Sequence, residues 1–132
     1  MRLKAHETLT RHLYFSLVYQ WDGRLPAHTR DNIREPSHEI YLSVVSVWEV
    51  IVKYQLGKLP LPESPELFIP AQRERHMIAS LALDEASVSR LITLPSLHRD
   101  PFDRMVICQA IYHNLTIATV DSAIRLYPID TI

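Results

Sequence analysis

The stretch His98-Arg99-Asp100-Pro101-Phe102-Asp103-Arg104-Met105 has the features of a helix beginning. Asp100 is suited to accept hydrogen bonds from the unpaired backbone amides of the first turn. Pro101 fits the first helical position, where no N–H is needed. Asp103 follows in the first turn, where a negative charge favours the positive end of the helix dipole. Taken alone, the stretch is explained as well by an ordinary helix start as by a functional site.

Another acid follows the next apolar segment. Residues 115–120, Leu-Thr-Ile-Ala-Thr-Val, are rich in β-branched side chains and have the pattern of a buried strand. Asp121 comes directly after this segment, at the strand end where open α/β sheets place their ligands. A strand end and a neighbouring helix start can bring Asp121 close to Asp103. Converging carboxylates need a cation between them or a raised pKa, and oxygen ligands of this kind suit Mg²⁺ or Mn²⁺.

A third acid lies on an earlier helix. Ser43 or Ser46 is predicted to cap a helix that runs to about Leu56. Its apolar stripe, which is expected to face the core, consists of Val45, Trp48, Val52 and Leu56. Glu49 lies beside this stripe, and Lys53 follows Glu49 by four residues. By themselves, Glu49 and Lys53 are explained by an exposed ion pair worth a few tenths of a kcal/mol.

Predicted strands alternate with helices along the chain. The sequence predicts a buried helix over 13–21 and strands at 40–43, 77–81, 115–120 and 127–132. This alternation is typical of an α/β fold with a mainly parallel sheet covered on both faces. Right-handed crossovers gather the C-terminal strand ends along one edge, where Glu49, Asp103 and Asp121 can meet. A chain of 132 residues suits a single domain, 1–132.

Composition narrows the function classes. The net charge of −1 provides no global basic field, so any nucleic-acid contact must rest on a local patch. Only two glycines are present, which excludes P-loop and dinucleotide-binding motifs. The single cysteine, Cys108, cannot form an internal disulfide and is expected to be a small buried hydrophobe. No apolar run is long enough to cross a bilayer, so the expectation is a cytoplasmic protein without membrane contact.

Four segments together resemble the PIN-domain proteins, and among them the VapC-type toxins of bacterial toxin–antitoxin modules. The segments are Ser46–Val50, Lys53–Leu59, His98–Arg104 and Thr119–Asp121. The resemblance extends from about Arg24 to Ile132. It implies a three-layer α/β/α fold and a metal-dependent endoribonuclease, in which an acidic quartet holds Mg²⁺ or Mn²⁺ and activates water to attack an RNA phosphodiester.

The positions that match this quartet are Glu49, Asp103 and Asp121. The family's first aspartate ends an opening strand in an Asp-Thr-His sequence, and its counterpart here is Thr10-Arg11-His12, which contains no aspartate. Fewer anionic oxygens around the cation weaken metal binding. Two functions therefore stay open: an active ribonuclease, or a degenerate PIN-like module that binds an antitoxin or RNA without cleavage.

The resemblance also implies an RNA substrate, a homodimer and a cognate antitoxin. Lys53, Arg99 and Arg104 are candidate phosphate contacts, which a near-neutral protein needs locally. Each of the three is also explained as a solvated or paired surface charge. Asp100 is assigned as a helix cap rather than as a metal ligand.

Overall fold

The computed structural model describes residues 12–15, 39–97, 100–118, 124–129 and 131. Four strands form a sheet in the order β3-β2-β1-β4, and every pairing is parallel. The strands are β1 (His12–Phe15), β2 (Glu39–Ser43), β3 (Ile78–Leu81) and β4 (Thr116–Ala118). The predicted parallel α/β architecture is thereby confirmed.

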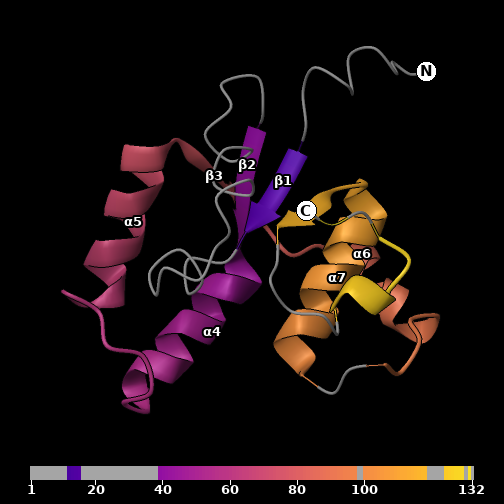
Figure 1. Cartoon of the computed structure of the whole chain (residues 1–132), viewed down its shortest axis with the longest axis horizontal. Helices are drawn as coiled ribbons and strands as arrows, with labels where there is room; N and C mark the ends of the chain where they lie inside the picture. Colours follow the sequence, from indigo (N-terminus) through magenta and orange to yellow (C-terminus); the bar gives the residue numbers. More distant parts are fainter. Residues whose placement is uncertain (1–11, 16–38, 98–99, 119–123, 130, 132) are drawn as a thin grey trace.

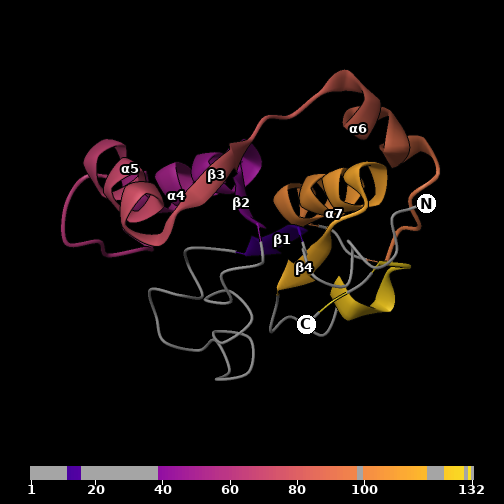
Figure 2. The ribbon, with the colours of Figure 1, turned by 90° about the horizontal axis from the view of Figure 1, so that it is seen from above.

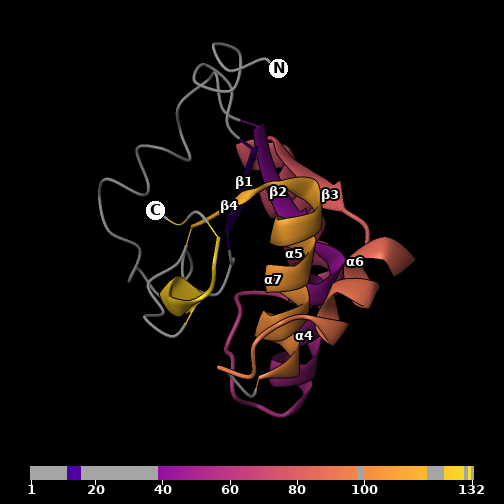
Figure 3. The same cartoon turned by 90° about the vertical axis from the view of Figure 1, so that its right-hand side faces the viewer.

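Helices cover both faces of the sheet. They are α4 (Val44–Gln55), α5 (Pro65–His76), α6 (Glu85–Ser89) and α7 (Pro101–His113), with short 3₁₀ turns η1 (Arg90–Ile92) and η2 (Ile124–Leu126). Helix α5 lies on one side of the sheet and α7 on the other (Figures 1 and 3). Helix α6 lies beside α7 (Figure 2). Helix α4 continues from the end of β2 and contacts both α5 and α7.

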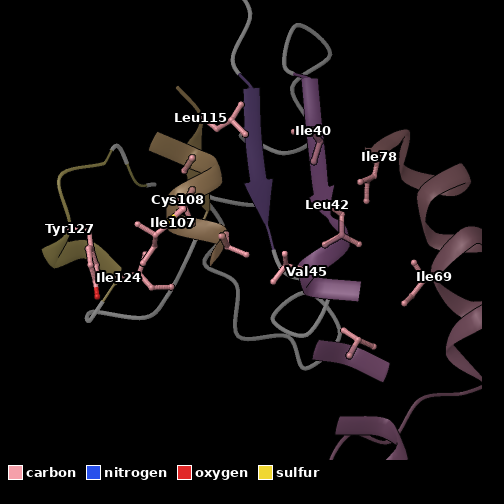
Figure 4. Packing of buried hydrophobic residues seen from close by; sticks show 14 of the residues in the cluster. Ile40, Leu42, Val45, Ile69, Ile78, Ile107, Cys108, Leu115, Ile124 and Tyr127 are labelled. Atoms are coloured by element: carbon pink, nitrogen blue, oxygen red, sulfur yellow. The ribbon is translucent and has the colours of Figure 1, made fainter. Parts of the chain in front are cut away.

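The buried core lies between these layers. Figure 4 shows Ile69 of α5 on one side of the strands and Ile107 of α7 on the other. Cys108 is fully buried, as predicted, and burial raises the pKa of its thiol. Other buried apolar residues include Ile40, Leu42, Val45, Val50, Phe68, Ile78, Val106, Ala110 and Ile117. Within the described residues, no helix combines the length and the apolar character that a membrane crossing requires.

The prediction of a helix over 13–21 is wrong at its beginning. Residues 12–15 form β1, which pairs with β2 on one side and β4 on the other, with Tyr14 opposite Tyr41 and Ile117. A continuous apolar run fits a central parallel strand as well as a buried helix, so its periodicity could not decide between them. Residues 16–21 lie outside the described part of the chain.

The predicted core stripe of α4 is also partly wrong. Val45 is buried, but Trp48 is 60% exposed and Leu56 is 62% exposed. The buried residues of α4 are Val45, Ser46 and Val50. Helix α4 extends beyond the ends of the strands (Figure 1), so the sheet can cover only its beginning. At the C-terminus, the predicted strand is represented among the described residues by one parallel bridge between Ile117 and Thr131.

A buried hydrogen-bonded link joins β2, α4, α7 and the end of β3. The Ser43 hydroxyl donates to Gln109 Oε1 (2.5 Å) and accepts from the Val45 N–H (3.0 Å), which caps α4. Gln109 Nε2 donates to the carbonyl of Ala82 (3.1 Å). Ser43 and Gln109 are both almost fully buried. We call this link the Ser43–Gln109 clip.

The clip should be important for stability. Ser43→Ala removes a helix cap, worth about 0.5–2 kcal/mol, and leaves a buried amide oxygen unpaired, at about 1–3 kcal/mol. We expect the free energy of unfolding in urea to fall by ~2 kcal/mol. Ser89→Ala, which removes only an exposed bond from Ser89 to the Glu85 carbonyl, should change it by less than about 0.5 kcal/mol. Equal effects of the two substitutions would contradict this role.

Candidate functional site

Three carboxylates converge where α4 passes the beginning of α7. Glu49 comes from α4, Asp103 from the first turn of α7, and Asp100 from the position before that helix. One carboxylate oxygen from each residue lies within 4.8 Å of the other two. All three residues are half-buried, and the Glu49 side chain is only 13% exposed. The predicted meeting of Glu49 and Asp103 is therefore observed.

The clip explains why these acids meet. Glu49 lies six residues after Ser43, and Asp103 lies six residues before Gln109. Six helical residues advance by about 9 Å and turn through the same angle on each helix. Helix α4 begins at this hydrogen bond, and α7 is joined to it at Gln109, in the middle of the helix. Because the two helices also contact each other, Glu49 and Asp103 lie at a similar distance from the bond.

Asp100 has two roles in this arrangement. Its Oδ1 accepts from the N–H groups of Phe102 (2.9 Å) and Asp103 (3.2 Å), which confirms the predicted helix cap. The same carboxylate belongs to the acidic cluster, which the sequence analysis did not predict. The Asp-x-x-Asp spacing carried a signal for this, because the cap and the third helical residue lie on the same side of the first turn.

The ammonium of Lys53 contacts this cluster. Its Nζ lies 2.7 Å from Glu49 Oε2, one helical turn away. Partial burial lowers the pKa of Lys53, but the hydrogen bond to Glu49 and the charge of Glu49 raise it. The charges of Asp100 and Asp103 add to this, and the pKa of Lys53 is raised overall. The ammonium therefore stays charged and offsets one of three carboxylates.

The donor set suits a small divalent cation. One carboxylate oxygen each of Glu49, Asp100 and Asp103 lies within 4.8 Å of the other two, so these residues would hold a single small cation between them. Carboxylate-only donors select Mg²⁺ or Mn²⁺ over softer metals. One Asp100 oxygen already caps α7, which keeps that carboxylate oriented.

The remaining predicted residues differ in their positions. Asp121 and Arg99 lie outside the described part of the chain. Arg104 uses Nη1 to bond the Pro95 carbonyl (3.1 Å), so one of its groups holds the segment that precedes α7. An aromatic contact also lies beside the acids, although the helical spacing of Trp48 predicts a core position for this residue. The rings of Trp48 and Phe102 pack edge to face, with centroids 4.8 Å apart.

Comparisons with known proteins identify relatives of this chain. The family model of the PIN domain matches residues 17–129. Ribonuclease VapC16 of Mycobacterium tuberculosis is 36% identical over 58 residues, which cover 44% of this chain and 41% of that protein. The chain therefore matches less than half of that relative.

Solved structures share the fold. A chain in the crystal structure of VapBC2 from Rickettsia felis, bound to a DNA fragment from their promoter, matches with a TM-score of 0.71 and 15% identity. That match covers 92% of this chain and 97% of the other. A chain of FitAB bound to an IR36 DNA fragment matches with a TM-score of 0.59 and 15% identity, over 91% and 93% of the two chains.

The position of Lys53 predicts competition with a metal. Lys53→Gln removes the ammonium that contacts Glu49. Unit charges 4 Å apart interact by about 4 kcal/mol at an effective dielectric of 20, and solvent at the partly exposed Lys53 reduces this. We expect the Kd for Mn²⁺, measured by calorimetry, to fall about tenfold, or ~1.4 kcal/mol. Lys58→Gln, at an exposed lysine past the end of α4, is the control. Unchanged or weaker Mn²⁺ binding in Lys53→Gln would refute the competition.

Proposed function

Because the chain belongs to the PIN domain family, we propose that it is a metal-dependent endoribonuclease, the toxin of a toxin–antitoxin module that acts in the cytoplasm. The observation that carries this proposal is the convergence of Glu49, Asp100 and Asp103 at the seam between α4 and α7. The likeness to Ribonuclease VapC16 supports RNA as the substrate.

We assign Glu49, Asp103 and Asp121 as the residues that hold Mg²⁺ or Mn²⁺, with Asp100 as a further ligand. Asp121 is included among these residues because it matches the family's terminal Thr-x-Asp sequence. When bound, the ion supplies a water of lowered pKa and neutralises charge that builds on the phosphate. The half-buried setting of Glu49 and Asp103 strengthens their hold on a cation, because fewer water molecules screen the charges.

The basic residues of the chain have a separate task. Lys53 lies at the acidic cluster and pairs with Glu49. If a metal ion replaces Lys53 as the partner of Glu49, the ammonium can bind a non-bridging phosphate oxygen. Arg99 precedes the cap of α7 and is proposed as a second phosphate contact. Arg104 is a weaker candidate, because its Nη1 already bonds a backbone carbonyl.

The same proposal implies that this chain binds other protein chains. The structural relatives include VapBC2 and FitAB, which are described as complexes bound to DNA. We propose that this chain likewise pairs with a cognate antitoxin and forms a homodimer. Exposed apolar side chains, that of Val44 at the beginning of α4 among them, offer surface for such contacts.

Cleavage assays test the enzyme directly. Purified protein, freed of antitoxin, should cleave single-stranded RNA in the presence of Mg²⁺ or Mn²⁺. Addition of a chelator should stop the cleavage. Asp103→Asn and Asp121→Asn should each lower the rate by at least ~100-fold, since even outer-shell partners cost 10–100-fold. Glu74→Gln, at an exposed acid on α5, should leave the rate unchanged. Cleavage that persists with chelator, or in both Asn variants, would defeat the proposal.

One observation favours a second candidate, a PIN-like module that binds without cutting. Strand β1 reads His-Leu-Tyr-Phe and contains no carboxylate. It begins at His12, whereas the resemblance places Thr10–His12 at the end of the opening strand. The residue that follows β1 in the chain is Ser16. The missing aspartate therefore has two candidate positions, Thr10 and Ser16.

Adding the acid separates the candidates. Parallel strands end at the same edge of the sheet as Ser43, so an aspartate after β1 should add a ligand near the other acids. We expect Ser16→Asp to tighten Mn²⁺ binding and raise cleavage more than Thr10→Asp does. If the unmodified chain cuts no RNA and either variant gains activity by orders of magnitude, the natural chain is the binding module.

A further inference from the structure

The seam between α4 and α7 contains a second contact beside the acids. Trp48 directly precedes Glu49 on α4, and Phe102 directly precedes Asp103 on α7. The two rings meet at 4.8 Å with an interplanar angle of 79°. Each helix thus presents an aromatic ring and a carboxylate at consecutive positions. The rings touch each other, and the carboxylates lie together.

Core packing does not account for Trp48. Phe102 packs against the buried cluster, but Trp48 is 60% exposed. Burial of the indole would stabilise the fold by about 25 cal/mol for each Å² of apolar surface removed from water, and this stabilisation is absent while the ring is exposed. Its edge-to-face contact with Phe102 fixes the ring at one place. The result is an ordered, largely open aromatic surface next to a cluster of metal-ligand type.

We propose that Trp48, supported by Phe102, is a nucleobase-stacking subsite of the metal centre. It would take the base of a nucleotide whose phosphodiester lies at the acids. The inference rests on the proposed ribonuclease function, because the acids hold a phosphate only through a cation. Stacking on an aromatic ring is worth about 1–3 kcal/mol per base, and every base has a face to stack.

The charge of the chain favours a base as the occupant. With a net charge of −1, the protein gains little from non-specific attraction to phosphates. Beside the acids, the Lys53 ammonium is paired with Glu49. A strand of RNA held at this seam therefore needs contacts that do not depend on charge, and an exposed indole provides one.

The competing occupant is a second copy of this chain. A helix-to-helix interface would cover α4 along its length and would bury Leu56, which is as exposed as Trp48. Leu56 lies eight residues beyond Trp48, about 12 Å along the helix, so a base stacked on Trp48 leaves it in water. Leu56→Ala is therefore the matched control for Trp48→Ala.

Binding of a non-cleavable 2′-O-methyl RNA oligonucleotide in Mg²⁺, followed by fluorescence anisotropy, tests the subsite. Trp48→Ala should weaken binding by about 5- to 150-fold, and Trp48→Phe should restore most of it. Leu56→Ala should have no effect. Removing one base of the oligonucleotide should reproduce the loss in the unmodified protein but not in Trp48→Ala. In a Trp21→Phe background, binding should quench the fluorescence of Trp48.

Three results would overturn the inference. The subsite is ruled out if Trp48→Ala binds the oligonucleotide as tightly as the unmodified protein does. It is also ruled out if the unmodified protein binds every abasic oligonucleotide as tightly as the complete one. Sedimentation in which Trp48→Ala and Leu56→Ala both dissociate a dimer, with oligonucleotide affinity unchanged, assigns the surface to a second copy. Failure of the unmodified protein to bind any oligonucleotide, with Mg²⁺ binding intact, defeats the ribonuclease proposal together with this one. Thermal unfolding and Mg²⁺ affinity of Trp48→Ala serve as checks on folding.

Discussion

The hydrogen bond between Ser43 and Gln109 determines where the acids of this protein lie. It joins the last residue of β2 to the middle of α7, and it is buried from water, where an unmade bond is costly. The same hydroxyl caps α4, so one side chain sets the start of one helix and the level of another. Packing alone allows two helices to slide, whereas a specific buried bond selects one register.

Convergence of carboxylates has an electrostatic cost that the fold offsets only in part. Asp100 accepts two backbone N–H groups, and Glu49 pairs with Lys53. The three carboxylates lie together at a half-buried place, and the Lys53 ammonium offsets the charge of Glu49. A divalent cation would offset the charge that Glu49, Asp100 and Asp103 share, which is the role proposed for the metal ion.

Local chemistry made much of the fold predictable. Asp100, Pro101 and Asp103 indicate a helix start in any context, and the apolar runs at β2 and β4 indicate buried strands. The failures concern information that is not local. β1 is a strand because two neighbouring strands pair with it, which the four residues His-Leu-Tyr-Phe cannot reveal by themselves. Trp48 has the spacing of a core residue, but its helix leaves the sheet before the stripe can be covered.

The candidate site was predictable to a similar extent. Glu49 and Asp103 were found because helical position and the resemblance agreed on them. For Asp100 the sequence predicts only a cap, because a cap fully explains an aspartate before Pro-Phe-Asp, although a capping carboxylate can also be a ligand. Lys53 was expected as an exposed pair of Glu49; the pair exists, but its meaning comes from Asp100 and Asp103 on another helix.

The proposed metal centre and the Trp48 ring together would let a chain of net charge −1 hold a polyanion. Attraction from a field of lysines acts over long distances and does not depend on sequence, and a chain of net charge −1 lacks such a field. In the proposed function, a cation at Glu49 and Asp103 would act at one phosphate, and the ring of Trp48 would act at one base. Both are short-range and both are set by the packing of α4 on α7. A binder built in this way is selective by geometry: it engages a strand only where a phosphate and an unstacked base can be presented together, which duplexes disfavour and single-stranded loops allow.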